Sequence, residues 1–147
     1  MKVGKTLIGI LIFTFYTGNI HSQNQDVKVT IETFFEAFHA KDTVKLKLIC
    51  SDKIMLQSIM ENANGAKLSE ESAKEFYKSI ASIPSDFKFE EKILNYSIQV
   101  DGTMAHAWTP YEFYINDKFS HSGVNAFTLF KENGIWKIIY VIDTRRK

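Results

Sequence analysis

Apolar positions change their spacing near Pro84, and before that residue the pattern is mainly helical. A first helix, capped by Asp26, has one apolar face formed by Val27, Ile31, Phe34, Phe35 and Phe38. Asp42 predicts the cap of a second, shorter helix, although its apolar residues also alternate as they would in a strand: Val44, Leu46 and Leu48. The pattern then predicts a strand over 53–60, a turn at Asn64-Gly65 and a third helix capped by Ser69.

After Pro84 the pattern is typical of β-strands separated by turn dipeptides. The expected strands cover 87–100, 103–115, 118–132 and 135–144. They are separated by Asp101-Gly102, Asn116-Asp117 and Asn133-Gly134, which are typical of two-residue hairpin turns. The sequence therefore predicts a four-stranded antiparallel meander. Helices followed by strands predict a single α+β domain whose helices pack on one face of the sheet.

The first 22 residues have the pattern of a signal peptide. Lys2 and Lys5 precede an apolar run that is too short to cross a bilayer, which needs about 20 residues. We expect cleavage after Ser22, export to the periplasm or the medium, and no stable membrane insertion afterwards. An uncleaved anchor is the alternative. The mature domain would then be residues 23–147.

Charge and cysteine content narrow the classes of partner. Without Lys2 and Lys5, 16 of the 18 basic residues remain against 17 acidic ones, so the composition does not favour nucleic acid or an anionic membrane. The single cysteine, Cys50, has no partner for a disulfide within the chain and is expected to be buried. No hydrolase, zinc or nucleotide motif is present, so no metal or cofactor is expected.

Hairpin register predicts which side chains share the inner face of the sheet. Two-residue turns at 116–117 and 133–134 would place Glu112 opposite His121, Trp108 opposite Asn125, and Phe127 opposite Tyr140. Together with the first helix, this face would form a pocket lined by Phe35, Phe38, His106, Trp108, Tyr114, Asn125, Phe127 and Tyr140.

The same register places an apolar set on the outer face, which conflicts with an exposed sheet. Its members are Leu94, Tyr96, Ile98, Val100, Ala105, Ala107, Ala126, Ile139 and Val141. Either a bulge shifts the register of strand 87–100, or a second subunit covers this face. The favoured explanation is a homodimer through the outer face.

Three stretches, together with the order of elements, resemble the nuclear transport factor 2-like superfamily. They are Thr109-Pro-Tyr-Glu-Phe-Tyr, His121-Ser-Gly-Val-Asn-Ala-Phe, and Gly134-Ile-Trp-Lys-Ile with the ending Asp143-Thr-Arg-Arg. The chain is most similar to the SnoaL-like and lumazine-binding-like branch of small exported bacterial proteins. The resemblance implies a cone-shaped curved antiparallel sheet packed on N-terminal helices, a pocket in the cone, frequent dimers, and functions from isomerase or dehydratase to plain binding.

Three kinds of function remain after this comparison. The isomerases of the superfamily place a tyrosine donor on the first helix, where this chain has Phe34, Phe35 and Phe38. We therefore favour non-catalytic binding of a small apolar or aromatic molecule. The enzymatic alternative is proton transfer by His121 and Glu112 in an isomerisation or dehydration, although a cross-strand ion pair would have the same residues. A dimerisation module with a filled cone is the third possibility.

Overall fold

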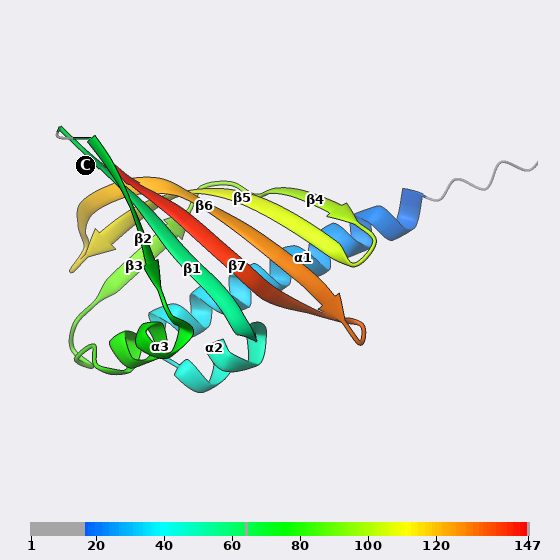
Figure 1. Ribbon diagram of the computed structural model, residues 1–147, viewed down its shortest axis with the longest axis horizontal. Helices are drawn as coiled ribbons and strands as arrows, with labels where there is room; N and C mark the ends of the chain where they lie inside the picture. Colours follow the sequence, from blue (N-terminus) through cyan, green and yellow to red (C-terminus); the bar gives the residue numbers. More distant parts are fainter. Residues whose placement is uncertain (1–16, 64, 147) are drawn as a thin grey trace, which may run out of the picture.

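The structure of the protein is a computed structural model that describes residues 17–63 and 65–146. The described residues form three helices and seven strands, which are labelled in Figure 1. They follow in the order α1 (Thr17–His39), α2 (Thr43–Ile49), β1 (Cys50–Asn62), β2 (Gly65–Glu71), α3 (Ala73–Ala81), β3 (Phe89–Ile93), β4 (Ser97–Asp101), β5 (Met104–Ile115), β6 (Lys118–Glu132) and β7 (Ile135–Arg146).

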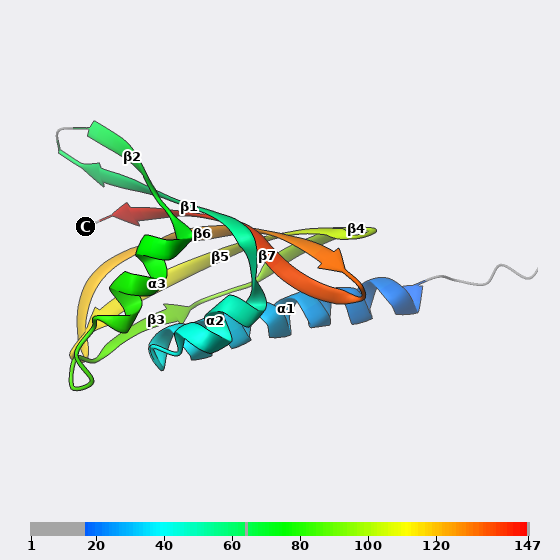
Figure 2. The same cartoon turned by 60° about the horizontal axis from the view of Figure 1, so that its bottom comes forward.

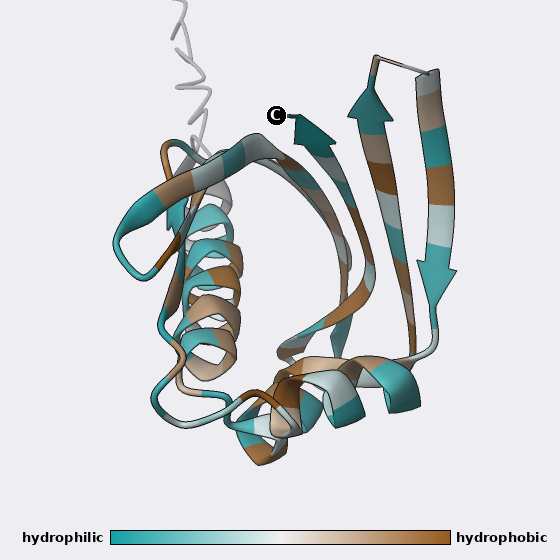
Figure 3. Ribbon diagram, turned by 90° about the vertical axis from the view of Figure 1, so that its left-hand side faces the viewer, coloured by the Kyte–Doolittle hydropathy of each residue, from teal (hydrophilic) through white to brown (hydrophobic). Residues whose placement is uncertain are grey.

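All seven strands form one curved sheet with the order β2-β1-β7-β6-β5-β3, and β4 also pairs with β5. The strands after Pro84 are antiparallel, as the sequence predicts, but β1 joins β7 in parallel, so the sheet is mixed. Figures 1 and 2 show α1 lying along the inner face of this sheet, with α2 and α3 near one end. Viewed along the cone in Figure 3, the sheet curves around the space beside α1. The α+β cone fold is confirmed.

One half of the cone is filled by a packed core. Val27 and Ile31 of α1 are fully buried, and they belong to the same apolar cluster as Ala105 and Ala107 of β5. The two alanines are among the residues with the smallest side chains in this cluster. Leu129 and the other buried residues of β6 and β7 complete the cluster, as expected for the apolar face of an amphipathic helix.

Local capping chemistry explains the two short helices. Asp42 caps α2 as predicted, because its Oδ1 accepts a hydrogen bond of 2.9 Å from the backbone of Lys45. The predicted cap of the third helix is wrong: Ser69 lies in β2, and Ser72 forms a capping box with Glu75. A polar strand that is exposed along its whole length lacks the alternation that identifies a strand in sequence, so β2 was not predicted.

The first helix begins earlier than its sequence pattern indicates. It starts at Thr17, so Asp26 lies inside the helix and does not cap it; the Asp26 carbonyl accepts a hydrogen bond from Thr30. Residues 1–16 of the expected signal peptide lie outside the described residues, and cleavage after Ser22 stays a prediction. No helix in the described residues is long and apolar enough to cross a membrane.

Two of the three predicted hairpin turns are confirmed, but the register beyond them is not. The third prediction, Asp101-Gly102, is wrong by one residue, because Asp101 pairs with Met104 and the turn is Gly102-Thr103. Asn116-Asp117 and Asn133-Gly134 connect their strands with positive φ at both central residues, as in type I′ turns. Beyond these turns, Ser120 in β6 and Ile139 in β7 are left unpaired as single-residue bulges. Because side chains alternate between faces, each bulge reverses the face of every later residue relative to its partner strand.

The bulges resolve the conflict between the two faces. Ala105, Ala107 and Val141 are buried on the inner face, which the predicted register assigned to the outer one. Ile98 and Val100 pack against the same core, so neither they nor Val141 need a second subunit to cover them. The predicted strand 87–100 is two strands, β3 and β4, and their pairing registers with β5 differ by one residue.

Candidate functional site

The second half of the cone is hollow. A cavity of about 710 Å³ lies between α1, α3, the β1–β2 hairpin and the inner face of the sheet. This volume is within the range of small-molecule sites, roughly 300–1,000 Å³. The cone is therefore open, and the possibility of a cone filled by its own side chains is not what the structure shows.

Much of the lining is an aromatic wall contributed by α1, α3 and two strands. Its residues are Phe34, Phe35, Phe38, Phe76, Phe113 and Phe127. The Phe34 ring is nearly parallel to that of Phe76, with centroids 6.4 Å apart, and meets Phe127 edge-on at 5.8 Å. Such contacts fix the rings in one arrangement, so the wall is a preformed apolar surface.

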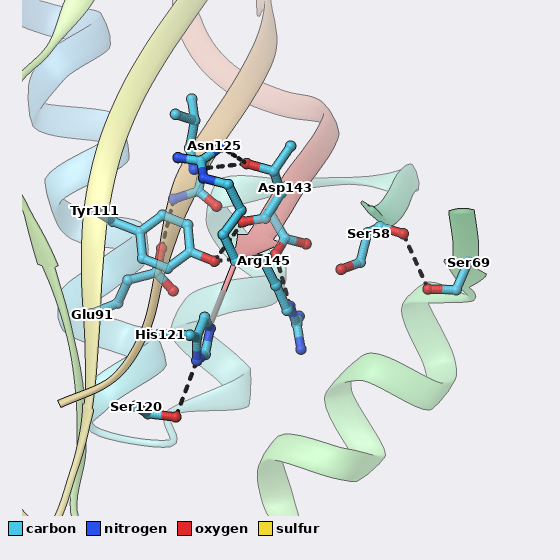
Figure 4. Close-up of polar contacts among 12 residues, drawn as sticks. Ser58, Ser69, Glu91, Tyr111, Ser120, His121, Asn125, Asp143 and Arg145 are labelled. Atoms are coloured by element: carbon cyan, nitrogen blue, oxygen red, sulfur yellow. Dashed lines mark hydrogen bonds and ion pairs between the residues drawn. The ribbon is translucent and has the colours of Figure 1, made fainter. Parts of the chain in front are cut away.

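The opposite side of the cavity is a polar wall, drawn in Figure 4. It consists of Glu91 from β3, Tyr111 from β5, His121 and Asn125 from β6, and Asp143 and Arg145 from β7. Four adjacent strands thus direct polar groups into one region. The same inner face is apolar in the packed half of the cone, so the polarity is confined to the cavity.

The partly exposed carboxyl of Glu91, enclosed mainly by protein, is the central group of the polar wall. Asn125 is 5% exposed, and its Nδ2 donates a hydrogen bond of 2.5 Å to Oε1 of Glu91. Burial raises the pKa of Glu91 to about 7, and the charge of Asp143 adds to this rise, while the Asn125 hydrogen bond and Arg145 oppose it. Glu91 therefore changes its protonation state near neutral pH.

His39, at the end of α1, holds the backbone of Glu91 in place. Its Nε2 accepts a hydrogen bond of 2.9 Å from the backbone N–H of Glu91. Burial lowers the pKa of His39, although the charge of Glu90 opposes the change. The imidazole is thereby kept neutral, the form that has a nitrogen able to accept a hydrogen bond.

Asp143, Arg145 and Tyr111 form a second group in the polar wall. Arg145 donates from Nε to Oδ2 of Asp143 over 2.8 Å. The Tyr111 hydroxyl donates to the Thr144 carbonyl over 2.9 Å and lies 3.4 Å from Asp143 Oδ2. Burial, together with the charge of Asp143, raises the pKa of Tyr111, so its hydroxyl stays protonated.

A glycine makes the position of Tyr111 possible. The Tyr111 ring passes over Gly123 of β6 to reach β7, and a Cβ at that position would lie 2.8 Å from the ring and would overlap the Thr144 carbonyl. Gly123 is thus required by a close approach, which is one of the recognised uses of glycine inside a strand.

His121 lines the cavity between two aromatic rings. It stacks on Phe113 with centroids 4.9 Å apart and contacts Tyr111 edge-on at 5.9 Å. Its Nδ1 lies 3.1 Å from the hydroxyl of Ser120, the bulge residue. The bulge residue therefore supplies a polar partner for the ring of His121.

Five of the ten residues that the sequence predicts for the site do line the cavity: Phe35, Phe38, His121, Asn125 and Phe127. The other five do not, because the bulges turn them to the outer face: His106, Trp108, Glu112, Tyr114 and Tyr140. The predicted pairing of Glu112 with His121 is wrong. Glu112 lies opposite Ser122 and accepts a hydrogen bond of 2.7 Å from Tyr114, while His121 lies opposite Phe113. Trp108, 49% exposed, lies opposite Ala126.

Sequence reasoning missed the most polar residues of the wall, above all Glu91, Tyr111 and Asp143. In a strand with an uncertain register, a charged residue is normally assigned to the solvent face. One signal was present: Ala105, Ala107 and Thr109 are small residues that alternate with larger ones up to Tyr111. Small side chains on one face of a strand indicate the face against which a helix packs closely.

The described residues contain no group of three or more His, Cys, Asp or Glu side chains placed to hold a metal ion. The carboxylates of the polar wall instead have amide and guanidinium partners. The side chains of the polar wall can supply hydrogen bonds, charge and proton transfer.

Comparison by sequence identifies no relatives: no family model matches the chain, and no curated protein matches it. Comparison by structure does identify similar proteins. A nuclear transport factor 2-like protein of unknown function from Shewanella baltica has a TM-score of 0.64 at 14% identity, covering 86% of this chain and 96% of that one. A candidate dehydratase of the same family from Streptomyces avermitilis has a TM-score of 0.67 at 12% identity, covering 86% and 98%.

A third similar structure has a different description. The β subunit of a candidate aromatic-ring-hydroxylating dioxygenase from Novosphingobium aromaticivorans has a TM-score of 0.70 at 10% identity, covering 86% of this chain and 91% of that one. At such identities the similarity establishes the fold and leaves the function open. The assignment to the SnoaL-like branch stays a prediction.

The raised pKa of Glu91 predicts a pH-dependent effect on stability. Below about pH 4 the carboxyl is protonated in both the folded and unfolded states and contributes nothing. As the pH rises to about 7, the unfolded state loses the proton first, so the free energy of unfolding falls. Glu91→Gln should remove this loss and gain stability over the parent, on the order of 2 kcal/mol by about pH 8.

Urea unfolding at several pH values measures this difference. Glu112→Gln, on the outer face, is the matched control and should follow the parent at every pH. A constant difference between Glu91→Gln and the parent from acid to alkaline pH would show that Glu91 has an ordinary pKa.

Proposed function

We propose that this chain, which has the nuclear transport factor 2-like fold, binds a small aromatic or apolar molecule in its cone. The observation that carries the proposal is the preformed cavity of about 710 Å³, apolar on one side and polar on the other. The aromatic wall would contact the body of the ligand. The polar wall would orient one hydrogen-bonding group of the ligand toward Glu91, Asn125 or Tyr111.

Filling the cavity should abolish binding without unfolding the protein. Ser58 of β1 lines the cavity and is only half-buried, so Ser58→Trp adds a large side chain without removing core atoms. We expect affinity for a neutral aromatic probe, phenethyl alcohol, to fall about 10-fold or more. NMR titration measures the affinity, and circular dichroism checks the fold.

Ile59→Trp is the control, because Ile59 is the next residue of the same strand and faces away from the cavity. It should bind the probe as the parent does. Equal binding by the Ser58→Trp variant would place the ligand elsewhere. A parent protein that binds no aromatic probe at millimolar concentration would contradict the proposal itself.

A second candidate function is proton transfer with Glu91 as the acid or base. A carboxyl with a pKa of about 7 that faces a cavity has the property that general acid–base catalysis requires. This replaces the predicted pair of His121 and Glu112, which the fold separates. The similarity to a candidate dehydratase supports it only at the level of the fold.

Deuterium exchange separates this enzymatic role from simple binding. In deuterated buffer, the parent should exchange the methylene protons of phenylacetone faster than buffer alone does. Glu91→Gln should reduce the exchange rate by about 100-fold, the usual contribution of a general base. Glu112→Gln should leave the rate unchanged. If the parent exchanges these protons no faster than buffer alone does, the protein does not abstract protons from activated C–H bonds, and the enzymatic proposal fails.

We also propose that the protein forms a homodimer through the outer face of the sheet. The proposal now rests on the residues that the structure leaves exposed on that face. The exposed residues there include Met104, Trp108 and Phe130, which lie together on β5 and β6. Trp108→Lys should therefore give a soluble monomer by light scattering, with ligand affinity unchanged because Trp108 does not line the cavity. A parent protein that is monomeric at micromolar concentration would contradict the dimer.

A further inference from the structure

The cavity is lined by more acidic than basic residues. Three carboxylates face it: Glu71 from β2, Glu91 from β3 and Asp143 from β7. Glu70 borders the cavity, but its carboxylate lies on the outer face, where Gln57 connects it to Tyr140. Among the described lining residues, Arg145 alone is a lysine or arginine. Arg145 is bound to Asp143 at 2.8 Å, so the charges of these two residues largely cancel. The remaining two carboxylates, Glu71 and Glu91, give the cavity an acidic character.

The two remaining carboxylates have neutral partners. Glu91 accepts from the Asn125 amide, and Glu71 accepts from Ser79 Oγ at 3.3 Å. A neutral donor leaves the negative charge of a carboxylate in place. Glu91 on β3 and Glu71 on β2 belong to the two opposite edges of the sheet, so negative potential reaches the cavity from both sides.

The aromatic wall favours the same sign of ligand charge. The faces of aromatic rings carry negative partial charge and attract cations within about 6 Å of the ring centre. Phe34, Phe38 and Phe76 lie nearly parallel to one another, with centroids 6.2 to 6.4 Å apart. Rings and carboxylates together form an environment that suits a cation attached to an apolar body.

We infer that the ligand is a small amine: an aromatic or apolar body that lies against the aromatic wall, with a protonated ammonium group against Glu91. The inference rests on the proposed binding function and specifies its ligand class. An anionic ligand would meet two uncompensated carboxylates, Glu71 and Glu91, and the one described guanidinium that lines the cavity is already bound to Asp143. A neutral ligand would leave the carboxylates without a charged partner.

The inference predicts how affinity depends on pH. Glu91 faces Tyr111 of β5, Asn125 of β6, and Asp143 and Arg145 of β7; His121 lines the same wall, and His39 of α1 binds its backbone. An amine with a pKa of about 10 stays protonated between about pH 6 and about pH 8, so the change in that interval comes from the protein. As Glu91 loses its proton near its pKa of about 7, affinity for the amine should rise with pH.

Three probes of similar shape test the sign of the charge: phenethylamine, phenethyl alcohol and hydrocinnamate. We expect phenethylamine to bind about 10-fold more tightly than the alcohol at about pH 8, and hydrocinnamate to bind most weakly. Glu91→Gln should lose most of the preference for the amine and its pH dependence, yet keep the affinity for the alcohol. Glu112→Gln, on the outer face, should behave as the parent does. NMR titration in low salt provides the affinities.

Each outcome separates the inference from the function on which it rests. If the alcohol binds as tightly as the amine, or if hydrocinnamate binds best, the ligand is not a cation, while binding in the cone stands. If none of the three probes binds, the proposed function fails and the inference with it. If Glu91→Gln does not fold, the pH dependence of the parent decides: equal rises for the amine and the alcohol would overturn the inference.

Discussion

Two single-residue bulges, at Ser120 in β6 and Ile139 in β7, determine which side chains of the sheet reach the interior. Without them, Trp108 and Tyr140 would point toward α1, and Tyr111 and Asp143 would point to solvent. With them, the inner face presents Ala105 and similar small side chains to the helix, and polar groups only beyond it. The packed half of the cone and its hollow half therefore have the same cause, since period-two alternation transmits each bulge along the whole strand.

The polar wall is costly to bury and is maintained by the rigidity of its surroundings. Glu91 has a hydrogen bond at its carboxyl from Asn125 and another at its backbone from His39, which lie on β6 and α1. Gly123 of β6 lets Tyr111 cross to β7, so β5 and β7 are linked through one hydroxyl over the strand between them. Groups held in this way do not need to reorganise when a ligand arrives, which is the usual origin of selectivity in a small polar site.

Sequence patterns predicted the features of this fold that depend on neighbouring residues. Asp42 as a cap and Asn133-Gly134 as a turn follow from local backbone chemistry, and both are confirmed. A bulge is different, because its free energy depends on the packing of every residue beyond it. Trp108 was consequently assigned to the wrong face, since this large aromatic residue is exposed, and Glu91 was not recognised as a site residue at all. The parallel pairing of β1 with β7 has no local signal at all.

The parallel pairing of β1 with β7 also has a consequence for folding kinetics. Leu56 pairs with Val141, so the two strands come from opposite ends of the domain and can meet only when the last strand is available. Contacts of such long sequence separation slow folding, because the chain loses entropy in closing the loop before the contact stabilises it. Until β7 is in place, the β1–β2 hairpin has no partner in the sheet. The wall of the cavity that contains Ser58 is therefore among the last parts of the molecule to form, and a nascent chain exposes its strand edges for as long as that takes.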